Sequence, residues 1–160
     1  MRKSQALAVL AALGAAVMIP AANAQDAFDA CTVFTQEDAE KALGGAASGE
    51  PVSSKVRRPK VVLGCAYHGS KDGKAVSATA QFKFSRTPDE AARAFDEARL
   101  QFQTKPMLIS GAEAFWSGKT GQMHVRKGRT WMTLSVGPAT VKQREVDPAR
   151  KLAELLVKKL

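Results

Sequence analysis

Two cysteines and two histidines are the side chains in this 160-residue chain that are best suited to metal binding or nucleophilic chemistry. Cys65 and His68 form a C-x-x-H pair, and Cys31 and His124 could complete a set of four ligands. Zinc ligands normally come as two close pairs in sequence, whereas these four are scattered. Redox enzymes usually use a C-x-x-C pair, which the chain lacks. The spacing therefore favours a disulfide between Cys31 and Cys65 over a metal site or a catalytic thiol.

Other catalytic motifs are missing or incomplete. Ser110-Gly111 and Ser117-Gly118 do not form the G-x-S-x-G turn of serine hydrolases. The segment 45–49 lacks the Lys-Ser/Thr of a phosphate-binding loop. Glu113 could act as an acid, but no motif places a second acid near it. We therefore predict no catalytic residue, no cofactor and no enzymatic activity.

The constellation best suited to binding a ligand lies in a predicted hairpin near residues 122–136. A two-residue turn at Lys127-Gly128 would place His124 opposite Trp131 and Arg126 opposite Arg129. Strand alternation then assigns a polar set to one face, which we call the predicted ligand face: Gln122, His124, Arg126, Arg129 and Trp131. Its aromatic and guanidinium groups could stack on a ring and bind a carboxylate or phosphate. The alternative is a solvated sheet face on which Trp131 shields a cross-strand histidine.

The chain is basic, with 24 Lys and Arg against 15 Asp and Glu and a formal net charge of +9. A basic run lies in a proline-containing stretch and comprises Lys55, Arg57, Arg58 and Lys60. Such a run is either a solvated surface or a contact for an anionic partner. The expected partner is an unknown anionic component of the cell envelope, or another protein, and not nucleic acid.

Residues 1–24 have the three parts of a secretory signal peptide. Arg2 and Lys3 precede an apolar run of about 14 residues, which is shorter than the roughly 20 residues that a membrane-spanning helix needs. Ala22-Asn23-Ala24 then matches the small-residue cleavage pattern, with the cut expected after Ala24. The predicted product is one domain, residues 25–160, periplasmic or secreted and without a transmembrane segment. An oxidising compartment also favours the Cys31–Cys65 disulfide.

The elements expected to position these residues alternate between helix and strand. Thr35 and Thr87 each begin a helix with capping signals, and the first helix ends at Gly44-Gly45. Residues 76–84 alternate as a half-buried strand does. Further strands are expected at 52–56, 61–68, 112–116, 122–126 and 130–136, and a last helix begins at Asp147-Pro148. This order indicates an α+β fold: a mainly antiparallel sheet with helices packed on one face, carrying a single disulfide.

Two stretches of the chain resemble small exported bacterial domains of unknown function. The first is Cys31-Thr32-Val33-Phe34-Thr35, followed by an acidic helix that ends in Leu43-Gly44. The second is Gly111-Ala112-Glu113-Ala114-Phe115-Trp116, followed by 122–128. The resemblance implies an α+β domain with a paired cysteine, and it carries no catalytic residue. The chain departs from the lipoprotein members because it lacks a cysteine directly after the apolar run.

The functional expectation is a non-enzymatic binding or accessory domain of the bacterial envelope, with an anionic ligand. The alternative is a protein-assembly partner that uses an exposed sheet face or edge. An enzyme with an active site outside known motifs is the least favoured class.

Overall fold

The computed structural model describes residues 28–45, 47–57, 61–102 and 104–160. Its elements, in chain order, are α1 (Ala30–Val33), α2 (Gln36–Leu43), β1 (Ala47–Val56), β2 (Val62–Lys71), β3 (Lys74–Phe84), α3 (Pro88–Gln101), β4 (Thr104–Ile109), β5 (Ala112–Ser117), β6 (Gln122–Lys127), β7 (Thr130–Pro138), η1 (Val141–Gln143) and α4 (Val146–Val157). The predicted signal peptide, residues 1–24, lies outside the described residues, as do Arg58 and Lys60 of the basic run. Among the described residues, no helix is long and apolar enough to cross a bilayer.

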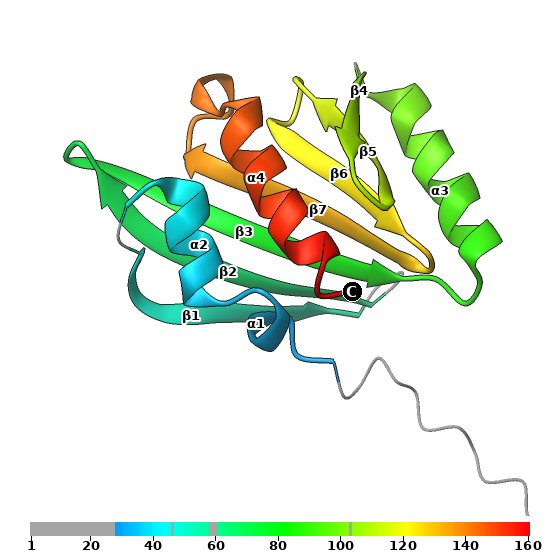
Figure 1. Ribbon diagram of the computed structural model, residues 1–160, viewed down its shortest axis with the longest axis horizontal. Helices are drawn as coiled ribbons and strands as arrows, with labels where there is room; N and C mark the ends of the chain where they lie inside the picture. The colour runs from blue at the N-terminus through cyan, green and yellow to red at the C-terminus, as the bar shows by residue number, and fades with distance from the viewer. Residues whose placement is uncertain (1–27, 46, 58–60, 103) are drawn as a thin grey trace, which may run out of the picture.

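The strands form one seven-stranded sheet in the order β1-β2-β3-β7-β6-β5-β4 (Figure 1). Every neighbouring pair is antiparallel. The two sequence-local sets, β1 to β3 and β4 to β7, meet where β3 pairs with β7. This confirms the predicted α+β class and antiparallel sheet.

One face of the sheet carries the main core. Residues that alternate inward on the central strands, such as Phe82, Met132 and Leu134, are fully buried there. The apolar stripe of α4 packs onto the same core through Leu152 and Leu156. Helices α2 and α4 lie side by side on this face, with α1 at its lower edge (Figure 1).

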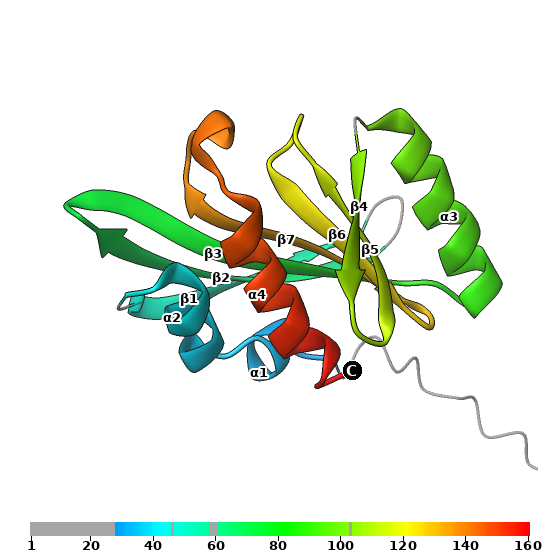
Figure 2. The ribbon, with the colours of Figure 1, turned by 45° about the horizontal axis from the view of Figure 1, so that its top comes forward.

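Helix α3 lies on the opposite face, against β5, β6 and β7. Its Phe95 ring contacts Phe115 and Trp131, and Phe102 stacks on His124. These partners alternate with the residues that face α4, so they point to the other side of the sheet. Figures 1 and 2 show α3 at the far end from α2, beyond β5. Three helices thus share one face, and α3 covers part of the other.

The helix starts follow the capping chemistry that the sequence predicts. Thr35 accepts a hydrogen bond from the Asp38 amide, and the Asp38 side chain accepts one from the Thr35 amide, which completes a capping box. Gly44 ends α2 with a φ of 66°, a left-handed conformation that glycine adopts without strain. Thr87 caps α3, with Pro88 in its first turn.

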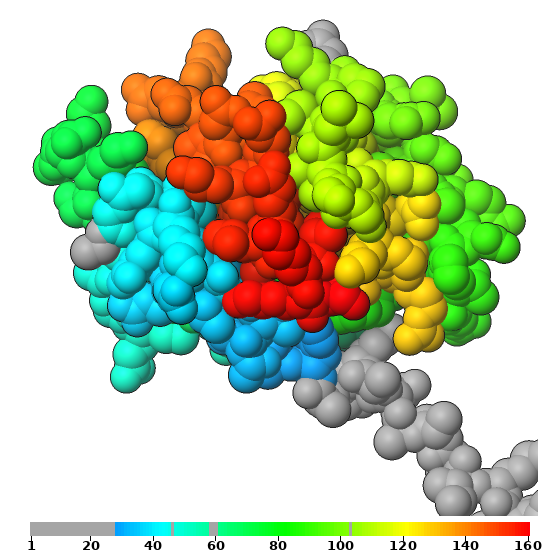
Figure 3. Space-filling model, in the orientation of Figure 1, coloured from blue at the N-terminus to red at the C-terminus, as the bar shows by residue number. Residues whose placement is uncertain are grey.

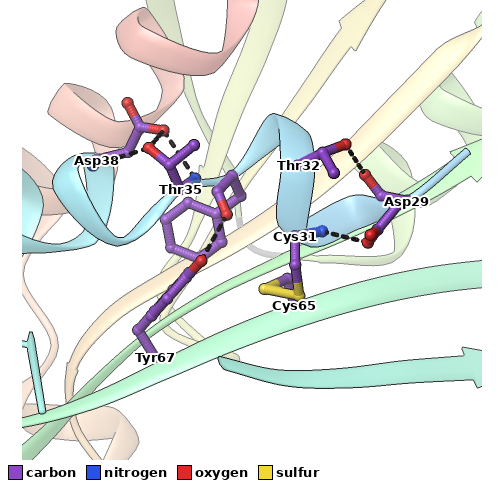
Figure 4. The surroundings of a disulfide bond; sticks show 8 residues. Asp29, Cys31, Thr32, Thr35, Asp38, Cys65 and Tyr67 are labelled. Carbon is purple, nitrogen blue, oxygen red and sulfur yellow. Dashed lines mark hydrogen bonds between the residues drawn. A yellow bond between two sulfur atoms is a disulfide. The ribbon is translucent and has the colours of Figure 1, made fainter. Parts of the chain in front are cut away.

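The N-terminal segment is held to the sheet by the Cys31–Cys65 disulfide, as predicted (Figure 4). The bond ties α1 to β2, and the Tyr67 hydroxyl donates a hydrogen bond to the Phe34 carbonyl at 3.1 Å. Nearby, the buried Asp38 carboxylate pairs with Lys159 just beyond α4. Burial alone would raise the pKa of Asp38, but hydrogen bonds from Lys159 and Thr35 outweigh it and hold the pKa below its usual value.

The β6–β7 hairpin differs from its predicted register. The turn is Gly128-Arg129, so Arg126 lies opposite Trp131 and His124 opposite Thr133. Gly128 has a φ of 56°. A positive φ at the first central residue is typical of a type II′ turn with glycine there. The predicted turn, Lys127-Gly128, is therefore wrong by one residue. The side chains of the two strands stay on their predicted faces, because each cross-strand partner shifts by two residues.

Candidate functional site

Residues of the predicted ligand face lie together at the β6–β7 hairpin, but α3 covers their centre. The His124 ring is sandwiched between Phe115 at 4.6 Å and Phe102 at 5.6 Å between ring centroids. Only 4% of His124 is exposed. Its Nδ1 lies 3.4 Å from the Thr133 hydroxyl, and its Nε2 has no hydrogen-bond partner among the described residues. Burial lowers its pKa to about 4, so the ring is neutral near pH 7.

The charged and aromatic neighbours of His124 are engaged within the fold. Arg126 forms a bidentate pair with Glu113, with nitrogen–oxygen distances of 2.8 and 3.0 Å. Trp131 packs edge-on against Phe95, and the Lys83 ammonium lies 4.5 Å from the centre of the Trp131 ring. Arg129 is exposed in the turn, and Gln122 is half-buried at the start of β6.

The prediction of an open ligand face is therefore wrong at His124 and Trp131. Gln122, His124, Arg126 and Trp131 do share one face of the sheet, as alternation requires, whereas Arg129 lies in the turn outside both strands. The physical reason for the correction is that two apolar side chains, Phe95 of α3 and Phe102 directly after it, are buried against this hairpin. The metal alternative also fails, because Cys31 and Cys65 are bonded to each other.

A pocket that the sequence did not reveal lies at the opposite corner of the molecule. It has a volume of about 340 Å³ and lies between α2, the β2–β3 hairpin, the end of β7 and the start of α4. Its apolar lining is Ala42, Leu43, Val76, Val136, Pro138 and Pro148, and its polar lining includes Lys71, Asp72, Lys74, Gln143 and Glu145. Figure 3 shows α2 in cyan, the hairpin tip in green and the segment before α4 in orange meeting at this corner.

Lys71 and Lys74 are the cationic side chains of this corner pocket, whose lining also holds the acidic Asp72 and Glu145. The two lysines are paired directly across the β2–β3 hairpin, which turns at Asp72-Gly73. Directly opposed residues of an antiparallel pair point to the same face, here the face that carries α2 and α4. Both lysines are exposed, and among the described residues no ion pair within 4.0 Å joins either to a carboxylate.

Two like charges placed opposite each other destabilise a hairpin, and an anion between them relieves the repulsion. A pocket lined by two lysines and six apolar residues suits a small ligand with an anionic head and an apolar body. The volume of about 340 Å³ is at the lower end of the range for small-molecule sites. The one sequence signal for this site is the Lys-Asp-Gly-Lys hairpin, whose turn type sets the two lysines face to face.

Comparison of the chain with protein-family models, with curated proteins and with solved structures finds no match. Function is therefore inferred from the geometry of the corner pocket and from the sequence.

Proposed function

We propose that the protein is a non-catalytic binding or accessory domain of the bacterial cell envelope, which holds a small anionic ligand in the corner pocket. The observation that carries this proposal is the directly opposed Lys71–Lys74 pair in a pocket whose other lining is largely apolar. The ligand class, an anionic head on a short apolar body, follows from the two lysines and from the apolar lining residues. The same chemistry occurs in a phosphate monoester or a carboxylate with a short alkyl chain.

The first test compares octyl phosphate with octanol by NMR titration of the purified protein. Octyl phosphate is expected to shift the methyl resonances of Leu43, Val76 and Val136, and octanol to bind about tenfold more weakly or not at all because it lacks the charge. The double variant Lys71→Gln/Lys74→Gln keeps side-chain length and removes both charges. It is expected to weaken octyl phosphate binding by about tenfold or more while leaving the fold at least as stable, since a like-charge pair is lost.

The matched control is Lys119→Gln, an exposed lysine in the β5–β6 connection that does not line the pocket. It should bind octyl phosphate as the unaltered chain does. Equal affinity in the Lys71/Lys74 double variant, or resonance shifts that avoid the pocket, would refute the proposal.

We further propose that the protein reaches an oxidising envelope compartment through cleavage after Ala24. The Cys31–Cys65 disulfide supports this, because such bonds persist chiefly outside the cytoplasm. Intact-mass measurement of protein exported by a bacterial host should give a chain that begins at Gln25. A mass that retains residues 1–24 would contradict the cleavage, and it would leave the pocket proposal standing.

The alternative function, a protein-assembly partner, is favoured by one separate observation. β1 forms an edge of the sheet, and nine of its ten residues are exposed along both faces. Such an edge can pair with a strand of another molecule.

A further inference from the structure

The two edges of the sheet differ in how well they resist pairing with another strand. β4 is six residues long and has Pro106 in its middle, where no amide can donate to a neighbouring strand. β1 is ten residues long, and its ladder with β2 is irregular only between Ser48 and Val52, next to Pro51. From Val52 to Val56 it pairs residue by residue with β2. Among the described residues, the other edge of this stretch has no strand beside it.

The exposed side chains of this stretch are unusual for a free edge. Val52 is 53% exposed and Val56 is 54% exposed. The two point to the same face, because they are an even number of residues apart in a strand. That face carries α3 over β5 to β7, whereas no described helix packs over β1 and β2 there. Edges that avoid association usually carry a proline, a bulge or an inward charge. In β1 the proline and the irregularity precede Val52, and Lys55 is the one charged residue within 52–56.

We propose that residues 52–56 of β1 pair antiparallel with the same residues of a second copy of this chain, about a twofold axis at Ser54. The sequence Val-Ser-Ser-Lys-Val is self-complementary in this register. Val52 of each copy lies opposite Val56 of the other copy, which gives two valine pairs, and each Lys55 lies opposite a neutral Ser53. Cross-strand valine pairs of this kind stabilise a sheet, and a twofold interface requires such self-complementarity.

The two neighbouring registers would give a less stable strand pair, so we place the axis at Ser54. Under a twofold axis perpendicular to the sheet, the opposed side chains of the two copies must point to the same face. The axis can therefore pass through a residue but not between two residues. An axis at Lys55 would oppose two ammonium groups, which destabilises the pair. An axis at Ser53 would set Lys55 against Pro51, which cannot donate to the ladder, and Val56 against Glu50. Of these three registers, only the one centred on Ser54 opposes valine to valine and leaves both Lys55 side chains against neutral residues.

The geometric test is a cross-link across the axis. Opposed Cα atoms in an antiparallel pair lie about 4.5–5.5 Å apart, within the range of a disulfide. Ser54→Cys is therefore expected to give covalent dimers on mild oxidation. Ser110→Cys, an exposed position in the β4–β5 turn, is the matched control and should stay monomeric. The native cysteines do not compete, because they are bonded to each other and Cys65 is buried.

The equilibrium test is sedimentation of the purified protein over a range of concentrations. The unaltered chain should dimerise reversibly, and more strongly as salt rises, because the net positive charge of each copy opposes association. Val52→Lys/Val56→Lys should weaken dimerisation at least about tenfold, since it replaces both valine contacts with opposed charges. Val141→Lys, at an exposed valine in η1, should not.

A monomer at all concentrations, or equal cross-linking at Ser54 and Ser110, would overturn the inference. The Lys71→Gln/Lys74→Gln variant should dimerise normally, which separates this test from that of the pocket.

Discussion

Removal of the Cys31–Cys65 disulfide is expected to lower the free energy of unfolding by about 4 kcal/mol. The bond closes a loop between residues 34 apart, and the chain-entropy estimate for a loop of that length gives this magnitude. Helix α1 has four residues, too few to be stable without tertiary contacts. The disulfide and the Tyr67–Phe34 hydrogen bond attach it to β2. When the disulfide is removed, the amides of α1 should therefore be the first to lose their protection against hydrogen exchange.

The measurement is urea unfolding of the variant Cys31→Ala/Cys65→Ala beside the unaltered chain with and without reductant. Alanine is preferred to serine because Cys65 lies within the apolar core, where an unpaired hydroxyl adds its own cost. The reduced chain and the double variant should unfold at similar urea concentrations, both well below the oxidised chain. If reductant leaves the midpoint of the unaltered chain unchanged, the bond contributes nothing to stability and the prediction is wrong.

The elements most readily predicted are those whose signals are local. Thr35 and Thr87 cap their helices through hydrogen bonds within one turn, so a few neighbouring residues suffice to identify each start. The alternation over β3 is equally local. The disulfide follows from compartment chemistry and from the presence of only two cysteines. None of these inferences requires knowledge of what packs against the element.

Registers and some strands are not predictable at this level. A slip of two residues in the β6–β7 hairpin keeps every side chain on its face, so the apolar pattern cannot distinguish Met132 from Leu134 as the partner of Met123. The sequence does not predict β4 because Pro106 argues against a strand, yet an edge strand tolerates a proline whose amide would point to solvent.

The prediction of an open ligand face is wrong because it depended on how helices pack against the sheet, which is a tertiary contact. The stripe of Phe95 and Phe102 predicts that α3 buries one side, but the stripe is equally compatible with either face of the sheet. The main face is filled by α2 and α4, which leaves the hairpin side for α3. The corner pocket escaped prediction for a related reason: its walls come from α2, β2–β3, β7 and α4, which the sequence does not place together.

Acidification is expected to destabilise the protein through one residue, His124. An unfolded histidine has its usual pKa near 6.5, whereas burial lowers the folded pKa of His124 to about 4. Between these values the unfolded chain binds more protons than the folded chain, so stability falls as pH drops from about 7 toward 4. The full loss is roughly 3 kcal/mol, given about 1.4 kcal/mol per pKa unit. Below about pH 4 both states bind the proton and this contribution stops changing.

Urea unfolding between about pH 7.5 and pH 4.5 measures this effect, and the second histidine supplies the control. His68→Gln, at an exposed position on β2, should keep the full acid dependence. His124→Phe keeps an aromatic ring between Phe102 and Phe115 and removes the titrating group, so its stability should change far less over this range. His124→Gln serves the same purpose if phenylalanine packs poorly against Thr133.

Asp38 does not confuse the comparison, because its lowered pKa places its own loss of stability at a pH below the range measured. An acid dependence of equal size in the unaltered chain and in both His124 variants would mean that other groups cause it and that the His124 ring is charged or solvated in the folded protein.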